Sequence, residues 1–320
     1  MRIKFNSIII NFQYTIKLLM KILHVNYSDT VGGAAIAANQ LHNNLVSHNI
    51  SSKMLVIDKN INSELIIGPK NKLEIFKAKL RIRIARFLKR KLFKTKNEQT
   101  FSFNFLNTEI LKKINNSDCD IVHLHWIGNE MISISQLKKI KKPIVWSFHD
   151  MWPINGGEHY SYDQRCKENY LDDNKPVNDG FFDINKFLWT KKLKNFNFEM
   201  NIICYSDWMF KLAQHSSLFK KAKIIKVPYG IDLNFWKSTD KESSKKYFNV
   251  NRDNKIILFG STSGTNNRKG FNFLAKALNL LNDNKLTLLI AGNKPKNLEM
   301  LNCDYIYLDK VDNVEDRRKL

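Results

Sequence analysis

Cysteine is scarce in this chain, and its cysteines stand far apart. The 320 residues include only Cys119, Cys166, Cys204 and Cys303, with no C-x-x-C pair among them. This spacing excludes a disulfide scaffold and a zinc ribbon, and it is typical of a protein in a reducing cytosol. No apolar run approaches the ~20 residues of a membrane span, so we expect a soluble, cytoplasmic protein.

Two nucleotide-binding signatures are also missing. No G-x-G-x-x-G follows the first apolar run, which disfavours an unrelated Rossmann-type enzyme that binds NAD or another nucleotide. The loop GSTSGTNNRKG at residues 260–270 lacks the spacing and the Ser/Thr of a Walker A loop.

Acidic residues are few relative to basic ones. Lys and Arg number 52 against 30 Asp and Glu, which gives a net charge of +22. This excess predicts an acidic partner, such as nucleic acid, anionic lipid or a phosphorylated substrate. Compositional drift in a chain rich in Lys, Asn and Ile explains the charge equally well. Whether the basic residues cluster in the sequence decides between drift and an acidic partner.

The charge does cluster, in the segment 70–96. This segment carries twelve Lys or Arg and a single acid, Glu74, and apolar residues recur at helical spacing from Leu73 to Leu88. Such a basic amphipathic helix can adsorb to an anionic membrane, where each cation contributes ~1 kcal/mol. A packed helix with a solvated basic face would have the same pattern. Nucleic acid is not expected, because no reader motif accompanies the charge. The cations expected to dock on a membrane are Lys77, Lys79, Arg81, Arg83, Arg86, Lys89, Arg90, Lys91 and Lys94.

Residues 1–19 differ from the rest of the chain. They are basic, with a short apolar middle that Asn11 and Gln13 interrupt, and no small-x-small cleavage site follows. We interpret them as an extension or a mis-set start, and a secretory signal as the minority alternative.

Strand and helix patterns alternate from Met20 onward, which predicts an α/β protein with parallel sheets. The first domain is expected to span 20–228, and a polar stretch over 228–255 separates it from a second domain, 229–320. The expected strands are 21–26, 52–57, 120–125, 143–149, 201–205 and 224–227, then 255–259, 286–290 and 305–308. The expected helices are 34–48, 135–142 and 271–281, with a long irregular stretch between residues 149 and 201.

In open α/β sheets, ligands bind beyond the carboxyl ends of the strands, so the loops that follow strands are the candidate sites. Gly32 and Gly33 precede a helix and would let an anion approach its N-terminus, although such pairs also occur in plain turns. His149 and Asp150 end an apolar strand, where an imidazole can bind a substrate hydroxyl or merely cap the strand.

A second candidate anion site follows the strand 255–259. Arg268 and Lys269 stand at the expected start of a helix, where the positive end of the helix dipole disfavours cations. A bound diphosphate would offset this repulsion, because its negative charge attracts both the cations and the helix N-terminus. His123 and His125 point to one face of a strand and could be metal ligands. No third ligand is evident from the sequence, so packing or lining of the cleft is the favoured interpretation, and no metal is expected.

As a set, six stretches resemble the retaining glycosyltransferases of family 4, and most closely a bacterial branch that builds surface polysaccharides. They are MKILHVNYSDTVGGAAIAANQLHNNL, DIVHLHW, KKPIVWSFHDMWPINGGEHYS, ICYSDWM, VPYGIDLNFW and LFGSTSGTNNRKGFNFLAKAL. The resemblance implies a GT-B fold of two Rossmann-like domains. It also implies transfer of a sugar from a nucleotide sugar to a saccharide or lipid-linked acceptor with retention, without a cofactor or catalytic metal.

The resemblance also implies roles for single residues. Gly32 and Gly33 would face the donor phosphates and the acceptor, and His149 would contact the donor sugar near the reacting centre. Lys269, helped by Arg268, would neutralise the diphosphate leaving group. Asp150 and His125 are further candidates for the acceptor cleft, residues 229–232 would mark the hinge, and the basic helix would dock on the inner face of the plasma membrane.

The chain departs from the family pattern in several places. Ser261 stands where the family often has Arg, and Glu158 where this branch often has Cys. The E-x7-E motif, which holds the donor sugar and ribose, would lie beyond Leu320. The resemblance therefore implies a C-terminally truncated second domain, and a non-catalytic module that binds membrane or acceptor is the alternative function.

Overall fold

The computed structural model describes residues 20–93, 99–161, 163, 165–171, 174–176, 182–261, 267–311 and 313–320. The chain divides into two compact units, Met1–Gly230 and Ile231–Leu320, and each is described here by itself. The boundary expected after residue 228 lies beside this division. The interpretation of residues 1–19 falls outside the described residues.

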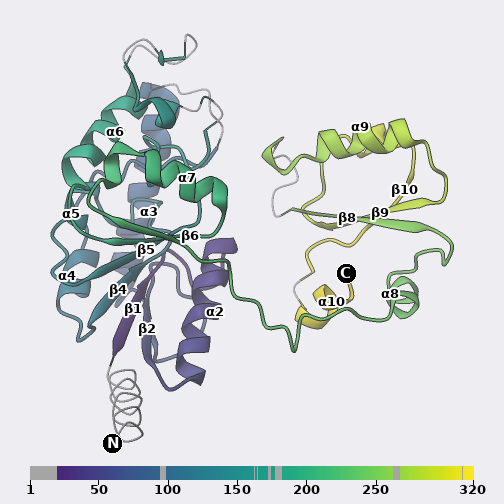
Figure 1. Ribbon diagram of the computed structural model, residues 1–320, viewed down its shortest axis with the longest axis horizontal. Coiled ribbons are helices and arrows are strands. Elements are labelled where there is room, and N and C mark those ends of the chain that lie inside the picture. Colours follow the sequence, from purple (N-terminus) through teal and green to yellow (C-terminus); the bar gives the residue numbers. More distant parts are fainter. Residues whose placement is uncertain are drawn as a thin grey trace, which may run out of the picture. The chain divides into compact units, whose positions relative to one another are not determined.

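The first unit is built on one parallel sheet with the strand order β3-β2-β1-β4-β5-β6-β7 (Figure 1). Because the order reverses between β1 and β4, the sheet has the switch point of a Rossmann-like fold. The strands are β1 (Lys21–Val25), β2 (Ser51–Leu55), β3 (Ile66–Ile67), β4 (Ile121–Leu124), β5 (Ile144–Phe148), β6 (Asn201–Cys204) and β7 (Lys223–Lys226).

Helices lie on both sides of this sheet, with α2 on one side and α5 and α6 on the other (Figure 1). The α-helices are α2 (Gly33–Ser47), α3 (Lys72–Phe87), α4 (Ile110–Asn115), α5 (Ile134–Leu137), α6 (Ile184–Asn195) and α7 (Asp207–His215). Shorter elements are the π-helix η1 (Leu88–Phe93) and the 3-10 turns η2 (Arg165–Glu168) and η4 (Ser217–Phe219).

The two faces of the sheet differ in chemistry because successive side chains of a strand alternate between them. One face carries the apolar side chains of the main core, such as Val25, Leu124 and Trp146, against which α4 to α7 pack. The opposite face carries His24, paired in register with His123, and α2 covers the β1–β2 end of it. The candidate site grows out of this second face.

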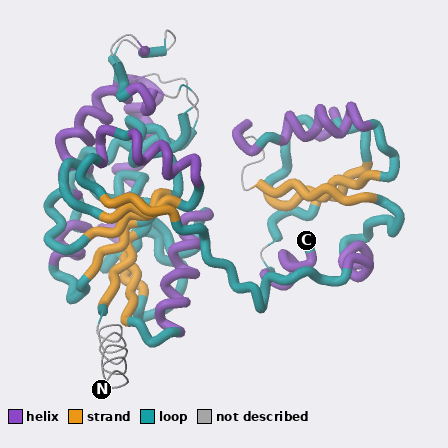
Figure 2. The backbone as a smooth tube through the Cα atoms, in the orientation of Figure 1, coloured by secondary structure: helices purple, strands orange, loops and turns teal. Residues whose placement is uncertain are grey.

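The second unit repeats the pattern on a smaller scale, with a parallel sheet in the order β10-β9-β8. Figure 2 shows the strands of this unit between helices. The helix α9 (Phe271–Leu281) packs on one face through Phe271, Ala275 and Leu278. Phe248 and Val250 pack against Leu289 on the other face. The remaining elements are β8 (Lys255–Ser261), β9 (Leu286–Gly292), β10 (Asp304–Tyr307), α8 (Lys241–Tyr247), α10 (Val314–Lys319), η5 (Asn267–Lys269) and η6 (Leu298–Met300).

No element was predicted within the polar stretch 228–255, which contains α8. Two expectations about local structure were wrong. The stretch between residues 149 and 201, expected to be irregular, contains α6. The helix expected over 135–142 ends as the short α5, because the Asn115 side chain bonds both Lys139 O and Lys141 N and so fixes a turn there.

Candidate active site

The carboxyl ends of five neighbouring strands carry the candidate residues of the first unit. Because the strands are parallel, these ends meet at one edge of the sheet, beside the switch point. The structure thereby brings together Gly32 and Gly33 after β1, His125 after β4, His149 and Asp150 after β5, Tyr205 after β6 and Tyr229 after β7.

A buried carboxylate holds the loop between β1 and α2 in place. Asp29 is fully buried and accepts hydrogen bonds from the backbone N–H groups of Asn60 and Ile61 at 2.8–3.0 Å, which ties this loop to the one after β2. Gly32 is the N-cap of α2 with φ 94°, a conformation that favours glycine. A Cβ atom on Gly32 or Gly33 would meet nothing within 4 Å, so the space above both glycines is open.

Imidazole rings form a chain that runs inward from this edge. His149 Nδ1 lies 2.8 Å from the hydroxyl of Tyr229, and His149 Nε2 lies 3.1 Å from Nδ1 of His125. His125 Nε2 lies in turn 2.9 Å from Nδ1 of His24, which is fully buried. The strand register explains the arrangement, because His24 pairs with His123 and His125 follows two residues later on the same face.

Burial lowers the pKa of every ring in this cluster. The pKa of His149 falls to about 4, although the charge of Asp150 opposes the shift. The pKa of His123 falls to about 3, through burial and then through repulsion from His149. The pKa values of His24 and His125 lie well below the usual range for the same reasons. The four imidazoles are therefore neutral at pH 7 and act as hydrogen-bonding groups.

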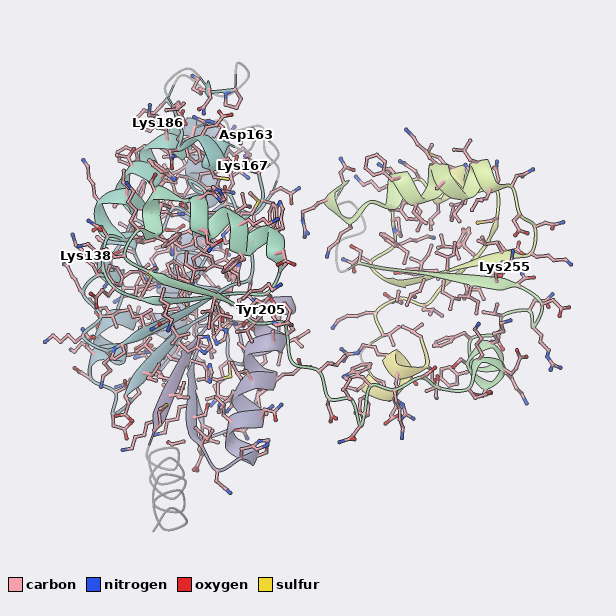
Figure 3. The ribbon with its side chains drawn as sticks, viewed as in Figure 1. Lys138, Asp163, Lys167, Lys186, Tyr205 and Lys255 are labelled. Carbon is pink, nitrogen blue, oxygen red and sulfur yellow. The ribbon has the colours of Figure 1, made fainter. Side chains whose placement is uncertain are left out.

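Two tyrosines form the outer wall beside His149. The rings of Tyr205 and Tyr229 stack with centroids 3.6 Å apart, and the ring centroid of His149 lies 5.2 Å from that of Tyr205. The Tyr205 hydroxyl donates to Ser147 Oγ at 2.8 Å, and Ser147 lies 2.8 Å from Nε2 of His123. Tyr205 marks the carboxyl end of β6 in Figure 3. Burial raises the pKa of both tyrosines, so both hydroxyls stay protonated at neutral pH.

The long loop after β5 folds around the side chain of Asp150. Asp150 is 6% exposed; its Oδ2 accepts from Trp126 Nε1 and His159 Nδ1, both at 2.6 Å, and its Oδ1 accepts from the backbone of Trp152 at 3.0 Å. These donors hold the pKa of the carboxyl below its usual range although burial alone would raise it. The carboxylate is thus engaged in holding the loop, and its role in an acceptor cleft stays a prediction.

A buried lysine anchors the same loop from α6. Lys192 Nζ donates to the carbonyls of Trp152, Asn155 (2.9 Å) and Gly156 (2.6 Å), and it lies 3.8 Å from the centroid of the Trp152 ring. Burial lowers its pKa, while the charge of Asp150 raises it. Three carbonyl acceptors match the three donors of an ammonium group. Lys192 therefore ties three carbonyls of the loop that carries Asp150 to α6.

The structure places a third histidine, His24, beside His123 and His125, which was not predicted from the sequence. One ring nitrogen from each of the three lies within 4.8 Å of the others, and all three residues are buried. The side chains are engaged with one another and with Ser147 and His149. The expectation that no metal takes part stays a prediction.

The second unit places its two candidate cations at the start of α9. Arg268 and Lys269 belong to η5 and are exposed, and Gly270 follows as the N-cap of α9 with φ 83°. The loop from β8 to η5 includes residues 262–266, which lie outside the described residues. The cations thus stand beside a helix N-terminus in the loop after the first strand of the unit, as expected.

The basic segment is the helix α3, and its apolar stripe faces solvent. Leu73, Phe76, Leu80, Ile84 and Phe87 are each 42–60% exposed and lie within an arc of about 80° on the helix. Ala78 and Ala85 are buried and face the unit. Arg81 and Lys89 are half-buried, and Lys94 lies outside the described residues. Of the cations expected to dock, those that are exposed are Lys77, Lys79, Arg83, Arg86, Arg90 and Lys91.

Among the described residues, no helix combines the length and the apolar character that crossing a membrane requires.

Comparisons with known proteins bear on the fold. No family model matches the chain, and no curated protein matches it in sequence. The Anabaena protein HepE, solved with UDP and glucose, is similar in structure, with a TM-score of 0.50 at 15% identity over 94% of this chain and 71% of that one. A glycosyltransferase from Rickettsia africae has a TM-score of 0.49 at 14% identity, covering 93% of this chain and 70% of that one. The chain therefore has the expected α/β fold with two Rossmann-like parallel sheets, as in GT-B glycosyltransferases.

Sequence reasoning missed several residues of this site. Tyr205 lies in the stretch ICYSDWM, but nothing in the sequence assigned it a role. Because the expected strands 143–149 and 201–205 end at His149 and Tyr205, these strand ends could have indicated that the two residues lie close together. In the sequence, His24 is indistinguishable from the other residues of a buried strand, and its hydrogen-bond partner His125 lies about a hundred positions away. Lys192 gave no signal, because nothing local distinguishes it from the exposed lysines of the chain.

Proposed function

We propose that the chain is a glycosyltransferase that takes a sugar from a nucleotide-sugar donor and transfers it to a saccharide acceptor. The observation that carries the proposal is the presence of two Rossmann-like sheets with distinct loops after their first strands. One loop has open glycines at the sheet edge that also carries His149, and the other has two cations at a helix start. The similar HepE structure, which holds UDP and glucose, supports this choice of ligand.

The roles follow from the chemistry of each group. His149 is neutral and can hydrogen-bond the sugar near the reacting carbon without adding charge. Arg268, Lys269 and the N-terminus of α9 would stabilise the diphosphate as negative charge develops on the leaving group. Gly32 and Gly33 leave room for the donor phosphates or the acceptor to approach the backbone.

The finer assignments of the resemblance belong to the same proposal. They are transfer with retention as in family 4, a lipid-linked acceptor, and a place in the synthesis of surface polysaccharide, O-antigen or capsule. No cofactor or catalytic metal takes part in this scheme. The order of motifs in the sequence supports these assignments.

Ligand binding to the full chain tests the proposal. UDP-glucose, GDP-mannose and NAD are compared by thermal shift and titration calorimetry, and we expect stabilisation by a sugar nucleotide alone. Lys269→Ala should weaken binding about tenfold or more, because a charge-assisted contact contributes 1.5–3 kcal/mol. Lys276→Ala, an exposed cation further along α9, is the matched control. Stabilisation by NAD but by no sugar nucleotide would contradict the proposal.

Turnover is tested separately from binding. Hydrolysis or transfer from the preferred donor should be lost in His149→Ala and kept in His215→Ala, which removes an exposed imidazole instead. A chain that binds the donor or a membrane without turnover would favour the alternative function, a non-catalytic binding module.

We further propose that α3 docks the enzyme on an anionic membrane. A row of exposed apolar side chains flanked by cations is the pattern of a helix that lies in the lipid interface. A packed helix with a solvated basic face, the other interpretation of this segment, would turn its apolar stripe toward the protein. The buried residues of α3 are two alanines, whereas the five larger apolar side chains of the stripe are each 42–60% exposed.

Vesicle sedimentation tests the docking. Full-length protein should bind vesicles that contain phosphatidylglycerol and not vesicles of phosphatidylcholine alone. Neutralising Lys77, Lys79, Arg83 and Arg86 to Gln should weaken binding about a thousandfold, at ~1 kcal/mol for each cation. The control carries four Lys→Gln changes at the exposed positions 211, 220, 221 and 223. Equal loss in both variants would show a general charge effect and contradict docking through α3.

A further inference from the structure

Three neutral imidazoles are joined in one hydrogen-bonded chain, and this restricts where their protons can be. The chain runs from Tyr229 through His149 and His125 to His24, with contacts of 2.8, 3.1 and 2.9 Å. Each contact uses a different ring nitrogen, so His149 and His125 each have both nitrogens engaged. The inner end is His24 Nε2, which is buried and has no hydrogen-bond partner among the described residues.

A neutral imidazole has one N–H donor and one acceptor nitrogen, so the three tautomers are coupled. If His24 donates from Nδ1, then His125 must donate from its own Nδ1 to His149, and His149 must donate from Nδ1 to the Tyr229 oxygen. If the direction is reversed, all three rings carry their proton on Nε2. A mixed arrangement would place two N–H groups or two lone pairs against each other.

The inner end of the chain decides between the two directions. With protons on Nε2, the N–H of His24 is a buried donor without an acceptor, which folded proteins rarely contain. With protons on Nδ1, only an acceptor lone pair is left unpaired there. At the outer end, Tyr229 is 50% exposed, so its hydroxyl can donate to water when its oxygen accepts from His149.

The geometry points to His24 and His125 as positioning residues that hold His149 as the Nδ1–H tautomer, whose donor faces the Tyr229 hydroxyl. A sugar hydroxyl or ring oxygen that takes the place of the Tyr229 hydroxyl would accept from this donor, whereas a group that can only donate would be rejected. The tautomers follow from the protein alone, whereas this consequence for the substrate rests on the proposed function.

Nitrogen-15 NMR of the full chain, labelled only at its eight histidines, tests the tautomers directly. We expect His24, His125 and His149 to give the two-bond coupling pattern of the Nδ1–H form, whereas exposed imidazoles in water mostly adopt the Nε2–H form. Nε2–H signals for these three rings would overturn the inference. Retention of a metal by the purified protein, with matching loss of the ring N–H signals, would overturn it too.

Substitution at the inner end tests whether the rings are coupled. His24→Leu removes the donor to His125, so the Nδ1–H signal of His149 should be replaced by a mixture of tautomers. His42→Leu is the matched control, because His42 is a buried ring of α2, the helix that covers this face, and it bonds Ser52 and not the chain of imidazoles. Unchanged His149 signals in a folded His24→Leu protein would refute the coupling. If that variant does not fold, the wild-type spectrum still decides the direction.

The substrate consequence has its own readout. If the transferase activity is established, each sugar hydroxyl of the donor is replaced by fluorine or by hydrogen. Fluorine can accept a hydrogen bond weakly but cannot donate one. At the hydroxyl that His149 contacts, the fluoro donor should bind about three- to tenfold tighter than the deoxy donor, the range of one neutral hydrogen bond. Equal loss with both at every position would overturn the donor role but would leave the tautomers and the proposed function standing.

Discussion

Mild acid should unfold the first unit, because its second sheet face is lined with imidazoles that are neutral when folded. His24, His123, His125 and His149 all have lowered pKa values, of about 3 for His123 and about 4 for His149. In the unfolded chain these groups return to about 6.5 and take up protons below that pH. The unfolded state therefore binds more protons, and stability falls as the pH falls below about 6.5.

The size of the effect follows from the same shifts. At about pH 5.5, a group with an unfolded pKa of 6.5 and a folded pKa of 4 or below destabilises the fold by about 1.4 kcal/mol. His123 and His149, with folded pKa values of about 3 and about 4, together cost about 3 kcal/mol. The lowered pKa values of His24 and His125 add to this cost in the same direction, and a loss of this size is a large share of the stability of many domains. Glu130 opposes this trend, since its raised pKa lets the folded state bind a proton first, but it is one group against four.

Urea unfolding followed by tryptophan fluorescence between pH 7.5 and 5 measures this dependence. The signal reports mainly the first unit, which holds Trp126, Trp146, Trp152, Trp189 and Trp208, whereas the second holds Trp236. His123→Asn should reduce the proton uptake on unfolding by about one, whatever it does to stability at pH 7.5. The exposed control His215→Asn should leave the slope unchanged. A stability that is flat between pH 7.5 and 5 would refute the reasoning.

Two other changes test single contacts. Lys192→Met leaves three carbonyls of the loop after β5 without their donor, so unfolding free energy should drop by about 3 kcal/mol or more, and proteases should cut between residues 152 and 160. Gly292→Ala places a Cβ atom 2.2 Å from Ser261 O at φ 100°, so it should destabilise the second unit by about 1–3 kcal/mol, read from Trp236. Gly230→Ala, whose Cβ meets nothing within 4 Å, is the control and should unfold like the wild type.

The strands were predictable because their signal is local. Runs such as those of β1, β4 and β5 are short and apolar and end at polar loops, and nearly every expected strand lies within one or two residues of the observed one. Alternation with helices then predicted parallel sheets, and the ends of parallel strands fixed where the candidate loops meet. The edge that carries Gly32, His125 and His149 followed from these rules alone.

The helix α6 could not be predicted from local sequence patterns. It buries Asn185 and Lys192 and exposes Phe187 and Leu193, so its polar and apolar residues do not separate into two faces. Each exception has a tertiary cause, since Lys192 reaches the carbonyls of the loop after β5 and Asn185 accepts from the backbone of Gly157 at 3.0 Å. These partners lie roughly thirty to forty positions away, and no periodicity records them.

The imidazole face of the first unit departs from the ordinary rule that buried sheet positions carry apolar side chains. Aliphatic residues at these positions would bury more apolar surface and would remove the acid sensitivity. His24→Leu therefore separates two roles of one residue. It should lower proton uptake on unfolding by about one while it releases the tautomer of His149. A variant that gains acid resistance and leaves His149 unchanged would show that His24 serves packing alone, and the link between the core and the site would have to be abandoned.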